Sequence, residues 1–319
     1  MLVGSRPSAK CSVVSIATVI GIVGLIGRPA AQTTAQWSVI QTVFLILFEN
    51  HDWSEIKGNP SAPYINGVVL PQAAHAERFF NPAGIHPSLP NYLWLEAGQN
   101  FGILDDNDPS VHHQNTTAHL VTQLERAGIS WKAYQENITG ATCPLVNNGQ
   151  YAVRHNPFVY FDDVTDGNSS TSAHCIAHVR PYSEMAGDLL QNNVARYNFI
   201  TPNICHDMHD CSVATGDAWL STEVPKILSS SSYQHALIFI TFDESDHADG
   251  PIGLIALSPF AKAGYANTLT YTHSSTLRTV QEIFGVTPLL GDAARATDFA
   301  DLFVFNVPPR PPTNLHIVR

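Results

Sequence analysis

The chain has 319 residues, of which 44% are hydrophobic and 13% are charged, and its formal net charge at neutral pH is −11. This composition is ordinary for a folded globular protein and excludes an intrinsically disordered chain. The acidic excess argues against nucleic acid as a partner, because Lys and Arg must neutralise the phosphate backbone. We see no Gly/Ser-rich or charged linker, so we expect one folded domain over residues 32–305.

Residues 1–31 are predicted to be a secretory signal peptide, because two basic residues precede the apolar run "CSVVSIATVIGIVGLIG" and small residues follow it. An uncleaved membrane anchor is the alternative, but this 17-residue run contains Ser and Thr and is shorter than the ~20 residues of a stable span. Cleavage would remove three basic and no acidic residues, changing the charge from −11 to −14. We therefore expect a secreted, periplasmic or extracellular protein.

Short apolar runs along the chain predict strands that are buried on both faces. They are "VFLILF" (43–48), "ISWKAY" (129–134), "YNFIT" (197–201), "ALIFITF" (236–242) and "GLIAL" (253–257). Amphipathic helical patterns lie between them, such as "TAHLVTQLERAG" (117–128) and "SSTLRTVQEIFG" (274–285). This alternation predicts an α/β fold in which a large, mostly parallel sheet has helices on both sides. Residues 306–319 are predicted to be a Pro-rich tail without regular structure.

Two of the predicted strands end in polar residues of the same kind. Glu49 and Asn50 follow the first run, and Asp243 and Glu244 follow "ALIFITF". Either pair alone is as easily a solvated strand end. Parallel strands would bring all four to one edge of the sheet, where massed carboxylates repel unless a cation lies among them. Oxygen ligands suit one hard divalent ion, Ca²⁺, Mg²⁺ or Mn²⁺.

Ser88 lies between Pro87 and Pro90, just before the short helical pattern "NYLWLEAG" that ends at Gly98. A residue at a helix N-terminus is near free backbone N–H groups, which favour an anion. A serine in this position is more often a simple helix cap.

Four cysteines remain after cleavage of the signal peptide, an even number in an oxidising compartment, so two disulfides are expected. Of the three possible pairings we favour Cys143–Cys175 and Cys205–Cys211, because each closes a local loop. A metal site of four thiolates is the rival, but the close paired spacing that it needs is absent.

Several motifs together resemble the bacterial and fungal phosphoesterase family that includes secreted acid phosphatases and is related to bacterial phospholipases C. The resemblance covers residues 43–291, nearly all of the predicted mature chain. The motifs are "ENHDWSEIKGNPSAPYIN", "HPSLPNYLWLEAG", "SWKAYQEN", "RHNPFVYF", "ITPNICHDMHDCS", "TFDESD" and "YTHSSTLRTVQEIFG", in this order.

The resemblance implies the alkaline phosphatase superfamily, hence a three-layer α/β/α sandwich, and a metal-bound Ser or Thr nucleophile. The segment "SLPNY" is similar to "TFPNH" of nucleotide pyrophosphatases, which gives Ser88 that role. The metal ligands that the resemblance implies are Glu49, Asn50, Ser88, Asp243 and Glu244. Since no His follows Asp243 directly, we expect a single metal, and a second one on Asp246, His247 and His273 stays open.

Histidines within the shared motifs are candidates to bind phosphate or to protonate the leaving group. We rank His273 and His209 above His206, with His86 next. The predicted function is a phosphomonoesterase that acts on a phosphate ester through a phosphoseryl intermediate. Phospholipase C or another phosphodiesterase is the alternative within this chemistry, and an inactive, exported, metal-stabilised binding module is the alternative from another class. The sequence does not predict the oligomeric state.

Overall fold

The computed structural model describes Met1, Gly4 and residues 36–246 and 249–305. Nearly all of the predicted signal peptide, the Pro-rich tail and His247 therefore lie outside the described residues. Among the helices of the described part, none has the length and apolar character needed to cross a membrane.

One eight-stranded sheet forms the centre of the domain, with the strand order β4-β3-β5-β1-β6-β7-β2-β8. All neighbouring pairs are parallel except those of β7, which runs antiparallel to both β6 and β2. The strands are β1 (Thr42–Phe48), β2 (Ala74–Phe80), β3 (Trp131–Gln135), β4 (Val179–Pro181), β5 (Tyr197–Thr201), β6 (Ala236–Phe242), β7 (Leu254–Leu257) and β8 (Tyr265–Thr272).

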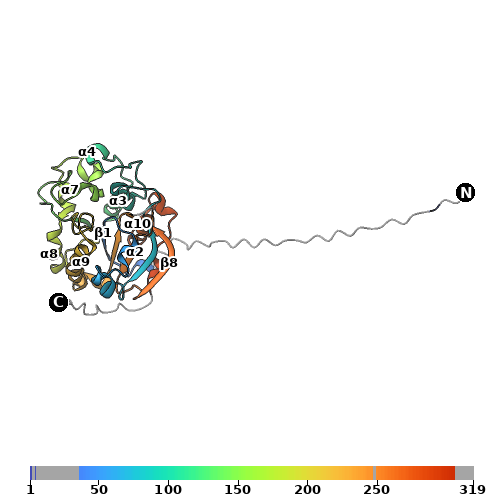
Figure 1. Ribbon diagram of the computed structural model, residues 1–319. Coiled ribbons are helices and arrows are strands. Elements are labelled where there is room, and N and C mark those ends of the chain that lie inside the picture. Colours follow the sequence, from blue (N-terminus) through green and yellow to red (C-terminus); the bar gives the residue numbers. More distant parts are fainter. Residues whose placement is uncertain (2–3, 5–35, 247–248, 306–319) are drawn as a thin grey trace.

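Helices pack around this sheet (Figure 1). They are α2 (Trp53–Ile56), α3 (Ser88–Ala97), α4 (Pro109–His112), α5 (Leu120–Arg126), α6 (Asp162–Thr165), α7 (Ala173–His178), α8 (Met185–Leu190), α9 (Val213–Leu228) and α10 (His273–Phe284). Short 3₁₀ turns and one π-helical turn (Ile65–Val69) connect them. The predicted three-layer α/β/α architecture with a mostly parallel sheet is confirmed.

The central strands β1 and β6 place the polar residues that follow them. Every residue of β6 is buried, and so is every residue of β1 except its first, which is why both segments are almost wholly apolar. The register pairs Phe48 with Phe242, so Glu49 and Asp243 leave the sheet at the same level. The backbone N–H of Asp243 donates to the Phe48 carbonyl (3.0 Å) and continues the ladder by one residue.

All five predicted strands are present, whereas β2, β4 and β8 were not predicted. β8, "YANTLTYT", is an edge strand with several exposed residues, and β2, "AHAERFF", contains a charged pair, so neither reads as an apolar run. Helix α3 begins at Ser88, three residues earlier than the predicted pattern. Pro90 is tolerated there because the N–H groups of a first helical turn have no partner within the helix.

Both expected disulfides are confirmed. Cys143–Cys175 spans 5.5 Å between Cα atoms and Cys205–Cys211 spans 4.7 Å. The second closes the loop after β5 at the carboxyl edge of the sheet, which limits the movement of the polar side chains that this loop carries.

Candidate active site

Ser88 lies beside the ends of the two central strands. Its hydroxyl donates to Oε2 of Glu49 at 3.0 Å, and Ser88 is almost fully buried as the first residue of α3. Asp243 is fixed from the same side, because its Oδ1 accepts the backbone N–H of Asn50 at 3.1 Å. The strand register thus brings Glu49, Asn50 and Asp243 together, and the start of α3 adds Ser88 to them.

Glu244 completes the predicted group from one side. Its Oε2 accepts Nδ2 of Asn91 at 3.1 Å and lies 2.5 Å from Nδ1 of His86. The other ring nitrogen of His86 lies 3.0 Å from Asp249. His86 therefore orients Glu244 and stays partly exposed to solvent.

Three further side chains surround Glu49 and were not predicted. The hydroxyl of Tyr92 donates to its Oε1. His155 stacks on the Tyr92 ring with planes 5° apart, and its two nitrogens lie 3.3 Å from Glu49 Oε2 and 3.3 Å from Asp207 Oδ2. Burial holds the pKa of His155 well below its usual value, so the ring is neutral and these contacts are not ion pairs.

The carboxyl groups of this site oppose one another's ionisation. Burial and the charges of Asp243 and Asp207 raise the pKa of Glu49 well above its usual value. Burial raises the pKa of Asp243 to about 6 and that of Asp207 to about 8, and burial together with Asp243 raises that of Glu244 to about 9. Four acidic groups in one buried place are destabilising without a compensating positive charge.

Several buried atoms at this place make no hydrogen bond. They are Oδ1 of Asn50, Nε2 of His155, Oδ2 of Asp207 and Oδ2 of Asp243. Glu49, His155 and Asp207 also offer ligand atoms that lie within 4.8 Å of one another. Unpartnered buried oxygens beside mutually repelling carboxylates suit a divalent cation, so the residues present fit such an ion.

The remaining predicted histidines lie in three different settings. His273 is fully buried at the start of α10, where Nε2 donates to the Asp243 carbonyl and burial lowers its pKa to about 4. Nδ1 of His206 lies 2.8 Å from Oε2 of Glu136, so Glu136 fixes the position of this ring. His209 is nearer to the site, because its backbone N–H donates to Asp207 at 2.8 Å.

Arg154 brings a positive charge to the same place. Its Nη2 lies 3.4 Å from Nε2 of His209, and its Nε lies 3.6 Å from Asp106 Oδ2, too far for a hydrogen bond. This Nε is buried without a hydrogen-bond partner. Asp106 in turn accepts the backbone N–H of Leu89 at 2.9 Å. Because the Leu89 N–H is already bonded to Asp106, the first turn of α3 has one free N–H fewer for binding an anion. The unpartnered Nε of Arg154 is the stronger hydrogen-bond donor to an anion here.

Sequence reasoning missed these functional candidates although their motifs were recognised. "RHNPFVYF" begins with Arg154 and His155, "CHDMHDC" contains Asp207 between its histidines, and "SLPNY" ends with Asn91 and Tyr92. Asn91 and Tyr92 lie one helical turn after Pro87 and Ser88, a spacing that brings them to the same face of α3. That spacing was the available signal.

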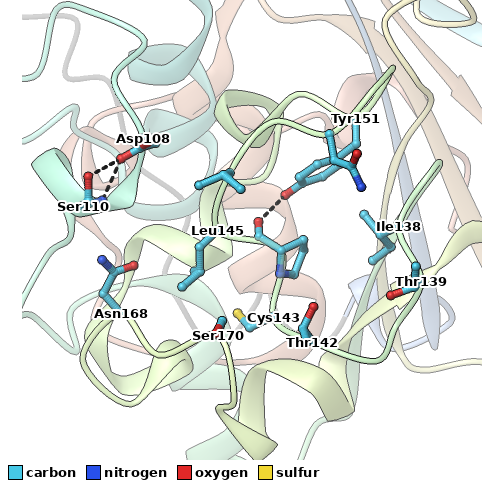
Figure 2. Close-up of a pocket in the computed structure, with 13 residues that line it drawn as sticks. Asp108, Ser110, Ile138, Thr139, Thr142, Cys143, Leu145, Tyr151, Asn168 and Ser170 are labelled. Atoms are coloured by element: carbon cyan, nitrogen blue, oxygen red, sulfur yellow. Dashed lines mark hydrogen bonds between the residues drawn. The ribbon is translucent and has the colours of Figure 1, made fainter.

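A pocket of about 490 Å³ lies elsewhere on the molecule, between the start of α4 and the segment that carries Cys143 (Figure 2). Asp108, Ser110, Leu145 and Tyr151 are among the residues that line it. None of the predicted site residues lines this pocket.

Comparison with known proteins decides the family. A model of the Phosphoesterase family matches residues 69–287, which is more than half of the chain. The chain belongs to the Phosphoesterase family. Its relatives are named phosphatases and phospholipases C, so this member is a hydrolase of phosphoric ester bonds. The resemblance found in the sequence is confirmed.

Among the relatives of this family member is phosphatidylinositol-3-phosphatase of Mycobacterium tuberculosis, 29% identical over 262 residues that cover 82% of this chain and 82% of the relative. A phosphate-repressible acid phosphatase of Penicillium chrysogenum is 28% identical over 217 residues, covering 65% of this chain and 51% of the relative. Phospholipase C A of M. tuberculosis is 25% identical over 271 residues, covering 67% and 51%. The chain therefore spans about half the length of these last two relatives.

Solved structures share the fold at low identity. Murine ectonucleotide pyrophosphatase/phosphodiesterase 5 superimposes with a TM-score of 0.53 at 10% identity, covering 83% of this chain and 100% of the other. A protein of the alkaline phosphatase superfamily from Vibrio parahaemolyticus gives 0.54 at 9% identity, covering 86% and 79%. The fold is that of the alkaline phosphatase superfamily.

Proposed function

We propose that this member of the Phosphoesterase family is a secreted, metal-dependent phosphomonoesterase in which Ser88 is the nucleophile. The observation that carries the proposal is the placement of the Ser88 hydroxyl at 3.0 Å from Glu49, beside Asp243, with unpartnered buried oxygens around them. A buried serine needs a nearby base and a way to lower its pKa before it can attack phosphorus. Glu49 lies where it can act as the base, and Glu49 and Asp243 together can hold an ion that lowers the pKa of the Ser88 hydroxyl.

The proposed ligands of one divalent ion, Ca²⁺, Mg²⁺ or Mn²⁺, are Glu49, Asn50, Ser88, Asp243 and Glu244, and His155 and Asp207 add two donors next to Glu49. The bound ion would neutralise the carboxylates and favour the alkoxide form of Ser88. Tyr92 is hydrogen-bonded to Glu49, and Asn91 and His86 are hydrogen-bonded to Glu244. These contacts fix the orientation of both carboxylates.

Ser88 loses its proton toward Glu49 and attacks phosphorus in line with the leaving alkoxide. The phosphorus–oxygen bond to the leaving group breaks as the Ser88–phosphorus bond forms, and water then hydrolyses the phosphoseryl intermediate. We assign the phosphate oxygens to Arg154 and the proton for the leaving group to His209, because these two contact each other next to the acidic cluster. We assign His273 and His206 the role of positioning residues. His273 is hydrogen-bonded to the Asp243 carbonyl, and His206 is hydrogen-bonded to Glu136.

A monoester substrate is favoured by the relatives that match well, which are named phosphatidylinositol-3-phosphatase and acid phosphatase. A diester substrate is the second candidate, because phospholipase C A matches a similar share of the chain. An inactive binding module is disfavoured, since the nucleophile and the whole donor set lie together. Export is supported by the two disulfides, which persist in oxidising compartments.

The test is hydrolysis of an aryl phosphate monoester and of the matching diester by protein stripped with a chelator and then supplied with Ca²⁺, Mg²⁺ or Mn²⁺ singly. The proposal expects no turnover after stripping, recovery with one ion, and a monoester rate at least tenfold above the diester rate. Equal activity before and after stripping contradicts metal dependence, and a faster diester rate favours the second candidate.

A further inference from the structure

A second cluster of potential metal ligands lies on the helical layer, formed by Glu125, His174 and His178. His174 and His178 are four residues apart on α7 and therefore project from the same face, while Glu125 lies in the last turn of α5. Their ligand atoms lie within 4.8 Å of one another. None of the three contacts the predicted catalytic residues in a hydrogen bond or ion pair that the described part of the chain shows.

Each imidazole is held by its second nitrogen. Nδ1 of His174 lies 2.9 Å from the Asp163 carbonyl, and Nδ1 of His178 lies 2.9 Å from the Trp131 carbonyl. A carbonyl can only accept, so Nδ1 carries a proton in both rings. This arrangement directs both Nε2 atoms outward and is the usual support of metal-binding histidines.

The two Nε2 atoms converge on one carboxylate oxygen. Oε1 of Glu125 lies 2.7 Å from Nε2 of His174 and 3.8 Å from Nε2 of His178. Neighbouring ligand atoms of a tetrahedral zinc ion are about 3.3 Å apart, which follows from bond lengths near 2.0 Å. The two observed separations lie on either side of that value, and all three ligand atoms lie within 4.8 Å of one another.

The surroundings fix the rings and leave the ligands accessible. Trp131 stacks on His178 with ring centroids 4.5 Å apart, and its Nε1 donates to Glu125 at 2.7 Å. The side chains of Glu125, His174 and His178 are 33%, 29% and 27% exposed, so water can reach a fourth position. The nearby cation Lys132 is paired with Asp188 at 2.5 Å.

We propose that Glu125, His174 and His178 bind one zinc ion at a site separate from the catalytic centre. Two imidazoles and one carboxylate suit Zn²⁺, whereas Ca²⁺ and Mg²⁺ prefer ligand sets made of oxygen alone. The ion joins α5 to α7, the helix that Cys143–Cys175 already tethers, and thereby stabilises this part of the domain. This site does not depend on the proposed function.

The test uses the full chain, stripped with a chelator and returned to zinc chloride in phosphate-free buffer at about pH 8. The hydrogen bond to Glu125 raises the pKa of His174 to about 9, so zinc must displace a proton from this ring when it binds. Bound zinc per chain is counted by competition with a chromophoric chelator, and Co²⁺ in place of zinc reports tetrahedral coordination by its visible spectrum. The variants are the double substitution His174→Gln with His178→Gln, the single His178→Gln, and His235→Gln as the matched control at an exposed histidine.

We expect the double variant to bind one zinc fewer than the wild type, to lose the tetrahedral Co²⁺ spectrum, and to gain less in Tm from zinc. The His235→Gln control should match the wild type. An unchanged zinc count in the double variant overturns the proposal. Should the double variant fail to fold, the single variant His178→Gln decides, because it keeps the Glu125–His174 contact. Its zinc affinity is measured by the same chelator competition. An affinity at least tenfold weaker than that of the wild type supports the site, and an unchanged affinity overturns it.

Discussion

Replacing Asp207 by Asn should stabilise the metal-free protein and weaken its response to metal. Asp207 is fully buried, and burial raises its pKa from 3.8 to about 8. Between these values the folded state binds more protons than the unfolded state, so the free energy of unfolding of the metal-free protein falls as the pH rises from 4 to 8. Asn cannot ionise, so the variant does not lose this part of its free energy of unfolding as the pH rises.

The size of the effect follows from the pKa of Asp207. At 1.36 kcal/mol per pH unit, the interval from 3.8 to pH 7 corresponds to at most about 4 kcal/mol. The same interval to pH 5 corresponds to less than about 2 kcal/mol. For a domain of this size each kcal/mol changes Tm by about 2 to 4 °C. The gain in Tm should therefore be clearly larger at pH 7 than at pH 5.

Thermal unfolding of chelator-stripped protein at both pH values, followed by titration with Ca²⁺, Mg²⁺ or Mn²⁺, measures both effects. Asp166→Asn is the matched control, because Asp166 is an exposed aspartate that follows α6 and does not belong to the site. The reasoning is refuted if Asp207→Asn lowers the Tm of the stripped protein at pH 7, or if metal raises the Tm of the variant as much as that of the wild type.

Three further results are expected. Asp243→Asn should lower the metal content of the purified protein, since it removes an anionic ligand, and unchanged stoichiometry by elemental analysis would show that Asp243 is not a ligand. Arg154→Ala should reduce kcat/KM for a monoester by about 10²-fold or more and Arg154→Lys by less, because a charged donor contacts the transferred phosphate; equal kinetics in steady-state assays would exclude the contact. Replacing Cys205 and Cys211 by Ser should reduce activity at temperatures below global unfolding, because the loop that carries His209 loosens, and parallel loss of activity and circular dichroism would contradict a local effect.

The parts of the fold that follow one simple pattern were predictable. β1 and β6 are buried on both faces, so their sequences are almost purely apolar and their polar ends stand out. β8 is exposed along much of its length at the sheet edge, and its sequence, with Thr at every second position from Thr268 to Thr272, is not apolar enough to be recognised. The pairing of β7 with two antiparallel neighbours depends on long-range contacts that no local pattern encodes.

The site shows the same division. Glu49 and Asp243 follow adjacent strands in register, so their proximity follows from the topology alone. His155 and Asp207 come from a 3₁₀ turn and a disulfide-closed loop, and they meet Glu49 only because these segments fold back over the sheet edge. The sequence showed that His155 and Asp207 are polar residues within shared motifs, but not that they are completely buried.

The most direct test of the central claim is to trap the phosphoryl group on the protein. Metal-loaded protein is mixed with a monoester, quenched in acid within the first turnover, digested, and mapped by mass spectrometry. We expect phosphate on the peptide that contains Ser88, no label in Ser88→Ala, and activity of that variant reduced by far more than tenfold. Phosphate on another residue, or Ser88→Ala activity within about tenfold of the wild type, would contradict Ser88 as the nucleophile.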